Sequence, residues 1–238
     1  MEKLEKKDNQ VTFTVQIDES LANAIRRYLS QIPILAIDDV EIIKNDSPLY
    51  DETIAHRLGL IPLKTEKATE KANIKFKLSA KKEGTVYSGE IKGNADVIYD
   101  KIPITVLTKG QELEINATGR LGKGMEHAKF SPGLIYYRDV SEIAMDKSLA
   151  DNLKKIGLKN EIKEKGDKII IMDNMRKEIL DVCEGLGEKA GKNVDVKPTG
   201  DLIITVESFG QISPEEMFKK SIEQLKKDLA EVSKKIGK

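Results

Sequence analysis

Hydrophobic and polar positions alternate over residues 11–17, which predicts a half-buried strand near the start of the chain. Asp18 is a suitable helix N-cap, and the apolar residues after it recur at helical spacing until Pro33 ends the pattern. We therefore predict a helix over residues 19–32. Its apolar stripe comprises Leu21, Ile25, Tyr28 and Ile32, and its opposite side carries Asn23, Arg26 and Arg27.

A second helix is predicted to begin at Ser47-Pro48, with serine as the cap and proline at the first helical position. It should run to Leu58, with Gly59 as a left-handed terminator. Buried strands are predicted before this helix, and the stretch after it is predicted to be rich in β-strands. The predicted strands are 34–37, 40–43, 74–78, 95–99, 102–107 and 113–117.

From about residue 141 the chain becomes rich in lysine and alternates between helical and strand patterns. The predicted elements are helix 146–156, strand 168–172, helix 173–186 with Asp173 as its cap, and strand 193–197. Cys183 lies at the edge of the apolar stripe of the second of these helices, which favours a small core residue over a reactive or ligating thiol.

The C-terminal segment carries the most regular pattern in the chain. After a predicted strand at 202–206, Ser213-Pro214-Glu215-Glu216 forms a capping box with proline at the first helical position. Apolar residues then follow at alternating spacings of four and three, at Phe218, Ile222, Leu225, Leu229, Val232 and Ile236. This narrow heptad seam predicts packing against another helix, either the 19–32 helix of the same chain or a helix of a partner protein.

Composition narrows the class of protein. The 238 residues contain 40 basic and 40 acidic side chains, so the net charge is zero, which argues against a protein that coats nucleic acid by bulk electrostatics. No apolar run reaches the 18–20 or so residues of a membrane helix, and the N-terminus does not resemble a signal peptide. A single cysteine excludes an intrachain disulfide framework and favours a reducing, cytoplasmic location.

Few residues are suited to catalysis or metal binding. Two separated histidines and one cysteine do not make a zinc site, and an iron–sulfur cluster normally needs three or four cysteines. No nucleophile-elbow or Walker-type motif is present. The glycine-rich segments 119–124 and 185–191 lack dinucleotide-binding spacing and are predicted to form turns. Asp38-Asp39 is better interpreted as a turn or strand-edge pair than as an acid–base or metal pair.

Several charged residues have both a structural and a docking interpretation. Arg26 and Arg27 fit a solvated helix face, but guanidinium groups also suit interfaces. His56 and Arg57 lie near a helix C-terminus, where positive charge meets the helix dipole favourably, and docking is an equal alternative. A general base at His127 would need a partner carboxylate and a pocket, and the sequence identifies neither. The segment around it, 124–132, predicts a loop with a binding role.

Five segments carry a family resemblance: 21–27 (LANAIRR), 33–40 (PILAIDDV), 49–63 (LYDETIAHRLGLIPL), 124–132 (GMEHAKFSP) and 206–210 (VESFG). In this order they resemble the D-subunit family of archaeal DNA-directed RNA polymerase. That family is related to the N-terminal region of the bacterial alpha subunit and to the third-largest subunit of eukaryotic polymerase II. The resemblance covers about residues 1–140 and 200–238.

The resemblance implies an α+β fold in three domains. A discontinuous dimerisation domain (1–45 and 200–238) would combine a sheet with two packed helices. A β-rich insert domain would occupy 46–140, and a small degenerate ferredoxin-like α/β domain 141–199. Some relatives carry iron–sulfur clusters in that last domain, but only Cys183 is present here, so no cofactor is expected.

The implied function is assembly. The chain would be a non-catalytic component of a nucleotidyltransferase that pairs with subunit L and, with subunits N and P, holds the two large catalytic subunits. It would meet DNA only indirectly and no membrane. The expected large-subunit contacts are Asn23, Arg26, Arg27, His56, Arg57, His127 and Lys129. The expected subunit L contacts are Phe218, Ile222, Leu225, Leu229 and Val232.

Two other classes are open to test. One is a DNA-binding module, which the zero net charge disfavours. The other is a metalloprotein or redox enzyme, which only the ferredoxin-like region supports.

Overall fold

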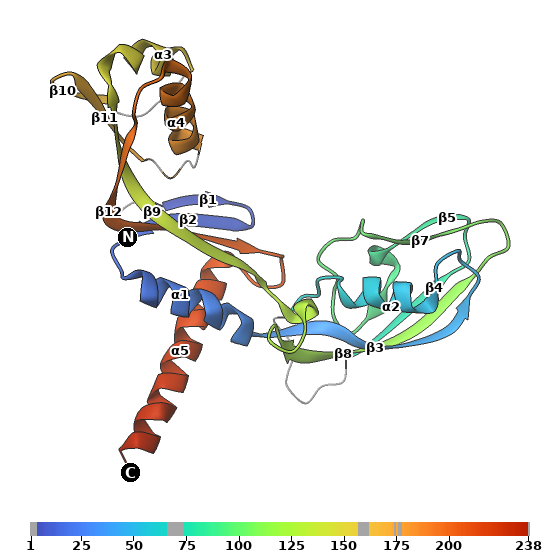
Figure 1. The fold of residues 1–238 in the computed structure, drawn as a ribbon. Helices are drawn as coiled ribbons and strands as arrows, with labels where there is room; N and C mark the ends of the chain where they lie inside the picture. Colours follow the sequence, from blue (N-terminus) through green and yellow to red (C-terminus); the bar gives the residue numbers. More distant parts are fainter. Residues whose placement is uncertain (1–3, 66–73, 157–161, 174, 176–177, 238) are drawn as a thin grey trace. The chain divides into compact units, whose positions relative to one another are not determined.

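The computed structural model describes residues 4–65, 74–156, 162–173, 175 and 178–237 (Figure 1). Its α-helices are α1 (Glu19–Tyr28), α2 (Asp51–Gly59), α3 (Ala150–Lys155), α4 (Glu178–Ala190) and α5 (Pro214–Ile236). Its 3-10 helices are η1 (Leu29–Gln31), η2 (Ser88–Glu90), η3 (Ala128–Phe130) and η4 (Lys147–Leu149). Its strands are β1 (Leu4–Lys7), β2 (Gln10–Val15), β3 (Pro33–Asn45), β4 (Ile74–Ala80), β5 (Gly84–Tyr87), β6 (Lys92–Gly93), β7 (Pro103–Leu107), β8 (Leu113–Lys123), β9 (Gly133–Asp146), β10 (Ile162–Lys165), β11 (Lys168–Met172) and β12 (Asp195–Ser208).

The elements form a mixed α+β protein with two compact units, Met1–Ala22 with Ile135–Thr205, and Asn23–Leu134 with Val206–Lys238. The first unit contains most of a six-stranded sheet of order β1-β2-β12-β9-β11-β10. α4 packs on this sheet through Ile179 and Cys183, which join a buried core with residues of β9 and β11. None of the described helices is both long and apolar enough to cross a membrane.

The second unit contains a four-stranded sheet of order β3-β8-β4-β6 and the two-stranded β5-β7. β4 alternates strictly between buried and exposed positions, so one face of this sheet packs against a core and the other meets solvent. α2 contributes its buried Ile54 and Leu58 to that core. α5 belongs to this unit and contacts η1.

The N-terminal and C-terminal predictions are largely confirmed. The predicted helix 19–32 is α1 followed directly by the 3-10 turn η1, and the predicted strand 11–17 is β2. The predicted segments 34–37 and 40–43 form one long strand, β3, with a bulge at Asp38. The capped C-terminal helix is α5.

The predicted start and terminator of the second helix are wrong. α2 begins at Asp51, because the side chain of Asn45 accepts hydrogen bonds from the Ser47 amide (3.0 Å) and hydroxyl (2.7 Å) and so holds the preceding residues in a turn. Gly59 is the last residue of the helix, and its backbone is not left-handed.

Two further predictions in the second unit are wrong. Residues 95–99 form no strand, and Val97 makes only an isolated bridge to Leu63. The glycines of segment 119–124 are not all turn residues, since Gly119 and Gly122 lie inside β8, where aromatic rings occupy the space that side chains would need.

Several predicted boundaries after residue 141 differ from the structure. Asp173 does not cap α4, which begins at Glu178, and residues 174, 176 and 177 lie outside the described residues. Gly185 and Gly187 lie within α4, and only Gly191 adopts the left-handed conformation of a helix end. The predicted strands 193–197 and 202–206 are one strand, β12. The predicted strand 168–172 is confirmed as β11.

Candidate functional site

α5 is a long helix whose start is fixed by its own sequence. Ser213 is the N-cap and accepts a hydrogen bond from the Glu216 amide at 3.3 Å, and Pro214 occupies the first turn. Glu215 and Glu216 complement the helix dipole there. The helix spans 23 residues, so it is roughly 35 Å long.

One side of α5 is covered by its own unit. Pro214, Met217 and Ser221 are buried, and the Ser221 hydroxyl donates to the Met217 carbonyl at 3.0 Å. Met217 lies so close to Gly133 that a Cβ there would be 2.6 Å from its Cε. Further along, Tyr28 lies beside Asp228. This covered face is offset from the predicted seam and was not predicted from the sequence.

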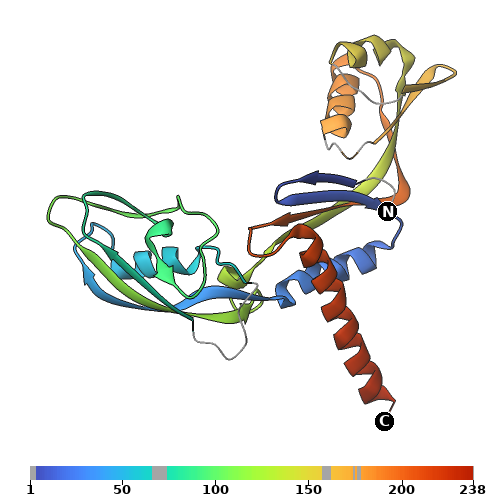
Figure 2. The ribbon, with the colours of Figure 1, turned by 180° about the vertical axis from the view of Figure 1, so that it is seen from behind.

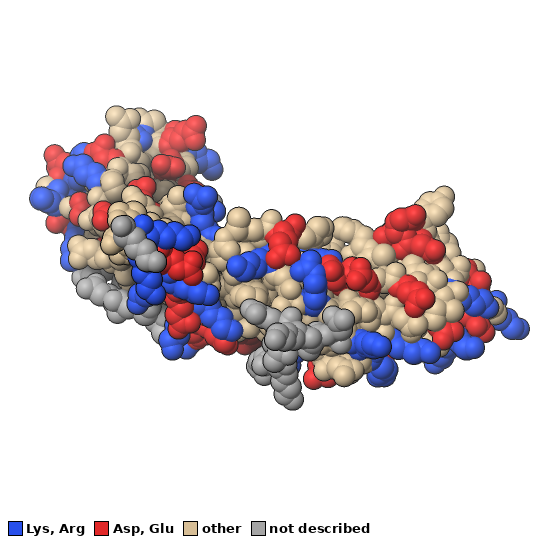
Figure 3. Space-filling model, turned by 90° about the horizontal axis from the view of Figure 1, so that it is seen from below, with Lys and Arg blue, Asp and Glu red and all other residues tan. Residues whose placement is uncertain are grey.

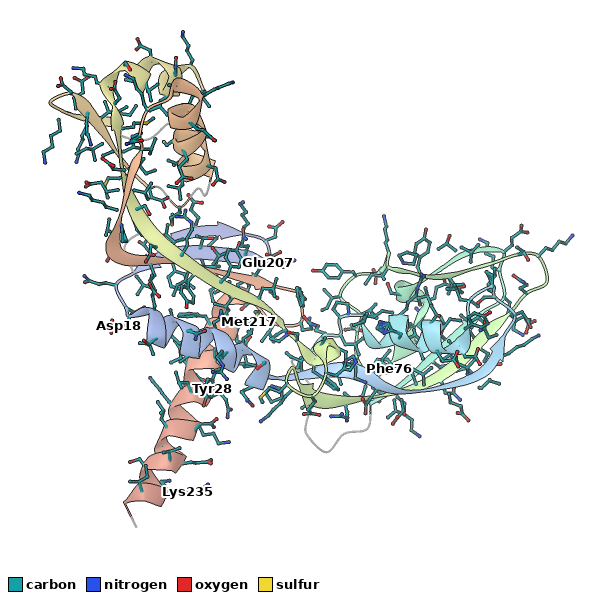
Figure 4. The ribbon with its side chains drawn as sticks, viewed as in Figure 1. Asp18, Tyr28, Phe76, Glu207, Met217 and Lys235 are labelled. Carbon is teal, nitrogen blue, oxygen red and sulfur yellow. The ribbon has the colours of Figure 1, made fainter. Side chains whose placement is uncertain are left out.

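The C-terminal half of the predicted seam is uncovered. We use "α5 seam" for its six residues, Phe218, Ile222, Leu225, Leu229, Val232 and Ile236. The first three are half-buried, whereas Leu229, Val232 and Ile236 are 59%, 51% and 80% exposed. In two opposite views, the C-terminal half of α5 extends away from the other elements of its unit (Figures 1 and 2). Figure 4 shows Met217 near the covered start of the helix and Lys235 near its C-terminal end.

α1 presents its charged residues as helical periodicity predicts. Arg26 and Arg27 are exposed, and Arg26 donates to the Asn23 side-chain oxygen at 2.8 and 3.2 Å. Burial and the nearby Asp228 carboxylate raise the pKa of Tyr28, so this phenol keeps its proton at neutral pH. Leu21, predicted in the buried stripe, is 45% exposed.

The two basic residues of α2 have different surroundings. Arg57 reaches across to β7 and donates to the Ile104 carbonyl at 2.9 Å, which ties α2 to that strand. His56, in the same last turn, is exposed. Docking remains a prediction for both residues, and Arg57 also has a bond within its own unit.

Lys129 and Asp38 form the centre of an ion-pair cluster. The Lys129 ammonium lies 2.5 Å from Asp38 Oδ1, and the Arg120 Nε lies 2.7 Å from Asp38 Oδ2. Arg120 also pairs with Glu126 at 3.0 Å. Both cations lie over the ring of the buried Phe130, at 4.8 Å for Arg120 and 5.1 Å for Lys129. The bulge at Asp38 in β3 aims its carboxylate at these two cations.

Partial burial of Asp38 opposes its ionisation, but the hydrogen bonds from Lys129 and Arg120 outweigh this effect and lower its pKa. Asp38 is therefore ionised at neutral pH and acts as a structural anion. His127 is exposed, and its Nδ1 accepts a hydrogen bond from the Lys129 amide at 3.1 Å, which caps η3. Arg120, Glu126 and Phe130 were not predicted from the sequence. The one sequence signal for a charged cluster here was the acidic pair Asp38-Asp39.

The segment 123–132 links parts of the unit that are distant in sequence. The Met125 amide donates to the Ser30 carbonyl at 3.3 Å, just after α1. The aliphatic part of the Lys129 side chain lies beside Gly59 at the end of α2. At the far end, the Phe209 amide donates to the Pro132 carbonyl at 2.9 Å, shortly before α5. The segment thus brings the ends of α1 and α2 and the approach to α5 into one network.

The described residues do not fit a metal or cluster site. No group of three or more His, Cys, Asp or Glu side chains among them is placed to hold a metal ion. The single cysteine, Cys183, is fully buried, and burial and the charge of Glu184 raise its pKa to about 11, which keeps the thiol protonated and unreactive. Its predicted role as a core residue is confirmed.

Surface charge is mixed in sign. In the face shown in Figure 3, Lys and Arg side chains are interspersed with Asp and Glu side chains. This distribution agrees with the zero net charge of the chain and is typical of a solvated or protein-binding surface.

The partly exposed apolar face of α5 is typical of proteins that associate with other chains. Residues 15–136 match the family described as the RNA polymerase Rpb3/RpoA insert domain. The chain is 36% identical over 232 residues to the DNA-directed RNA polymerase subunit Rpo3 of Thermococcus kodakarensis, covering 90% of this chain and 88% of that one. It is 32% identical, over an alignment of 256 positions, to the Rpo3 of Archaeoglobus fulgidus, covering 98% of this chain and 96% of that one.

The chain therefore belongs to the archaeal Rpo3 family of DNA-directed RNA polymerase subunits, which is the D-subunit family that its motifs resemble. The family resemblance in the sequence is confirmed by these comparisons.

Proposed function

We propose that this chain is the non-catalytic assembly subunit of an archaeal RNA polymerase and that it pairs with subunit L through α5. The α5 seam is the observation that carries the proposal. Three of its residues expose more than half of their surface, although the same helix buries Met217 and Ser221 against its own unit. An apolar stripe in this position is typical of a helix that is completed by another helix.

The resulting heterodimer, with subunits N and P, would hold the two large catalytic subunits. In this proposal residues 1–45 and 200–238 form the dimerisation domain, 46–140 the insert domain and 141–199 a ferredoxin-like domain without a cluster. The exposure of Arg26, Arg27, His56 and His127 supports docking of the large subunits on these residues. Contact with DNA would be indirect, through the complex.

The described contacts divide the proposed large-subunit residues into two groups. Asn23, Arg26, Arg57, His127 and Lys129 already bond within their own unit. Their substitution would therefore alter the local structure as well as any interface. Arg27 and His56 offer the cleaner tests of docking, because both side chains are exposed and neither forms a side-chain hydrogen bond or ion pair with a residue that the structure describes.

The test is to mix the purified full chain with a subunit L homologue and to measure molar mass by light scattering. We expect a 1:1 complex at micromolar concentration, since helix pairs of this kind fall in the obligate class that buries more than about 2,000 Å² in total. Two independent monomers under these conditions would contradict the proposal.

A further inference from the structure

The heptad positions beside the α5 seam differ in charge and in surroundings. With Phe218, Leu225 and Val232 at d and the other seam residues at a, the residues that flank the seam fall at e and g. The e positions are Lys219, Lys226 and Ser233, and the g positions are Ser221, Asp228 and Lys235. One flank is thus basic over its first two heptads.

The first two heptads of the g flank face the chain's own unit. Ser221 is buried there, and Asp228 lies beside Tyr28 of α1 and accepts a hydrogen bond from Gln224 at 3.0 Å. A second helix that packs on the seam therefore approaches from the e flank.

The e flank is open. Lys219 and Lys226 are exposed, and neither forms an ion pair with a residue that the structure describes. They lie seven residues apart on the same side of the helix, so both ammonium groups border the seam in consecutive heptads. A partner helix seated on the seam would meet both charges.

We propose that the partner helix carries acidic side chains along the flank that faces Lys219 and Lys226, and that these lysines select this partner over a second copy of the chain. This inference rests on the proposed pairing through α5. Opposite charges at the flanking positions of a helix pair set partner choice and orientation, whereas like charges across the seam disfavour it.

A second copy would not supply the acidic flank in either orientation. In an antiparallel pair the e positions face each other, so Lys219 and Lys226 would meet only Lys219, Lys226 or Ser233 of the other copy, none of which is acidic. In a parallel pair Lys219 would face Pro214 and Lys226 would face Ser221, and neither of these residues is acidic. The helix is therefore matched to a different chain.

The test compares two charge-reversed variants of the full chain for binding to subunit L. The variant K219E/K226E reverses the e flank, and the control K227E/K234E reverses two exposed lysines, also seven apart, on the side opposite the seam. All four lysines are exposed, so both variants should fold as the unaltered chain does, which circular dichroism would verify. Both variants carry the same net charge.

We expect K219E/K226E to weaken subunit L binding by about tenfold or more, mostly through slower association. The control should stay within about threefold of the unaltered chain. The affinity of the unaltered chain should also fall more steeply with salt than that of K219E/K226E, because the flanking pairs are screened.

Equal binding by K219E/K226E and the unaltered chain would overturn the inference while leaving the pairing intact. Formation of a stable dimer by the unaltered chain alone at micromolar concentration would also overturn it, since the e flank would then tolerate a second copy. No binding of subunit L by any of the three proteins would instead contradict the proposed function.

Discussion

The ring of Phe130 occupies the space that a side chain on Gly122 would fill, since a Cβ at Gly122 would lie 2.6 Å from ring atoms Cε2 and Cζ. Phe130 is fully buried and lies beneath the Lys129 and Arg120 cations that hold Asp38. Substituting Gly122 by alanine should therefore push the ring out of its packing. We expect G122A to lose about 1–3 kcal/mol of unfolding free energy, measured by denaturant unfolding of the full chain.

Gly185 offers the matched control for that substitution. It lies in α4, and its backbone is not left-handed. Apart from its chain neighbours and the backbone of its own helix, nothing lies within 4 Å of the position that a Cβ would take. G185A should be neutral or stabilising by up to about 1 kcal/mol, because alanine favours the helix. Equal losses in G122A and G185A would show that the Phe130 contact is not the cause.

The charge on Asp38 makes a pH-dependent contribution to stability. Its pKa is lower in the folded chain than in the unfolded chain, so its stabilisation is complete above the unfolded pKa of about 4 and is lost as the pH falls through the lower folded value. D38N should cost about 1–3 kcal/mol at pH 7.

The measurement for Asp38 is the difference in Tm between D38N and the unaltered chain at pH 7 and at pH 3. We expect the difference to shrink at pH 3, because this pH lies below the unfolded pKa of about 4 and part of the stabilisation is lost there. D39N is the control, since Asp39 is the adjacent, exposed acid. A difference that is the same at both pH values would rule out the ion-pair explanation.

The exposed end of the α5 seam should matter for pairing and not for the fold of the chain itself. Leu229 is already 59% exposed, so L229D should leave the Tm of the isolated chain nearly unchanged. In the complex the new carboxylate would be buried without a partner, at a cost of about 3–5 kcal/mol, or roughly 100-fold or more in affinity.

A230D is the control for the seam, because Ala230 is exposed, adjacent in sequence and off the seam. It should bind subunit L nearly as tightly as the unaltered chain in isothermal calorimetry. Similar losses in L229D and A230D would indicate a general effect of helix charge.

Arg27 should act in the step after subunit pairing. R27A should form the heterodimer with subunit L normally, because Arg27 lies on the exposed side of α1, and should recruit the large catalytic subunits less well. Reconstitution followed by size-exclusion chromatography measures this step. K109A removes the same charge from an exposed turn, and a defect shared by both variants would argue against a specific Arg27 contact.

Local sequence signals were enough to predict some elements. The start of α5 was predictable because serine, proline and glutamate act within one turn of the chain. The exposure of Arg26 and Arg27 followed from helical periodicity alone. In contrast, the start of α2 depends on the side chain of Asn45, whose bonds to Ser47 compete with a cap at that serine.

The candidate site contains contacts that no local pattern reveals. Lys129 and Asp38 are 91 positions apart in sequence, and their ion pair forms only once β3 and the segment after β8 are placed side by side. Gly122 looked like a turn residue because its packing partner, Phe130, cannot be identified before the fold is known. The covered face of α5 was missed because the buried hydroxyl of Ser221 is satisfied by the helix itself.

The proposed function requires that another chain completes the C-terminal half of α5. Hydrogen–deuterium exchange over residues 218–236, with and without a subunit L homologue, tests it most directly. We predict rapid exchange around Leu229 to Ile236 in the isolated chain and strong protection of the same amides in the mixture. Exchange that stays rapid in the presence of saturating subunit L would contradict the account.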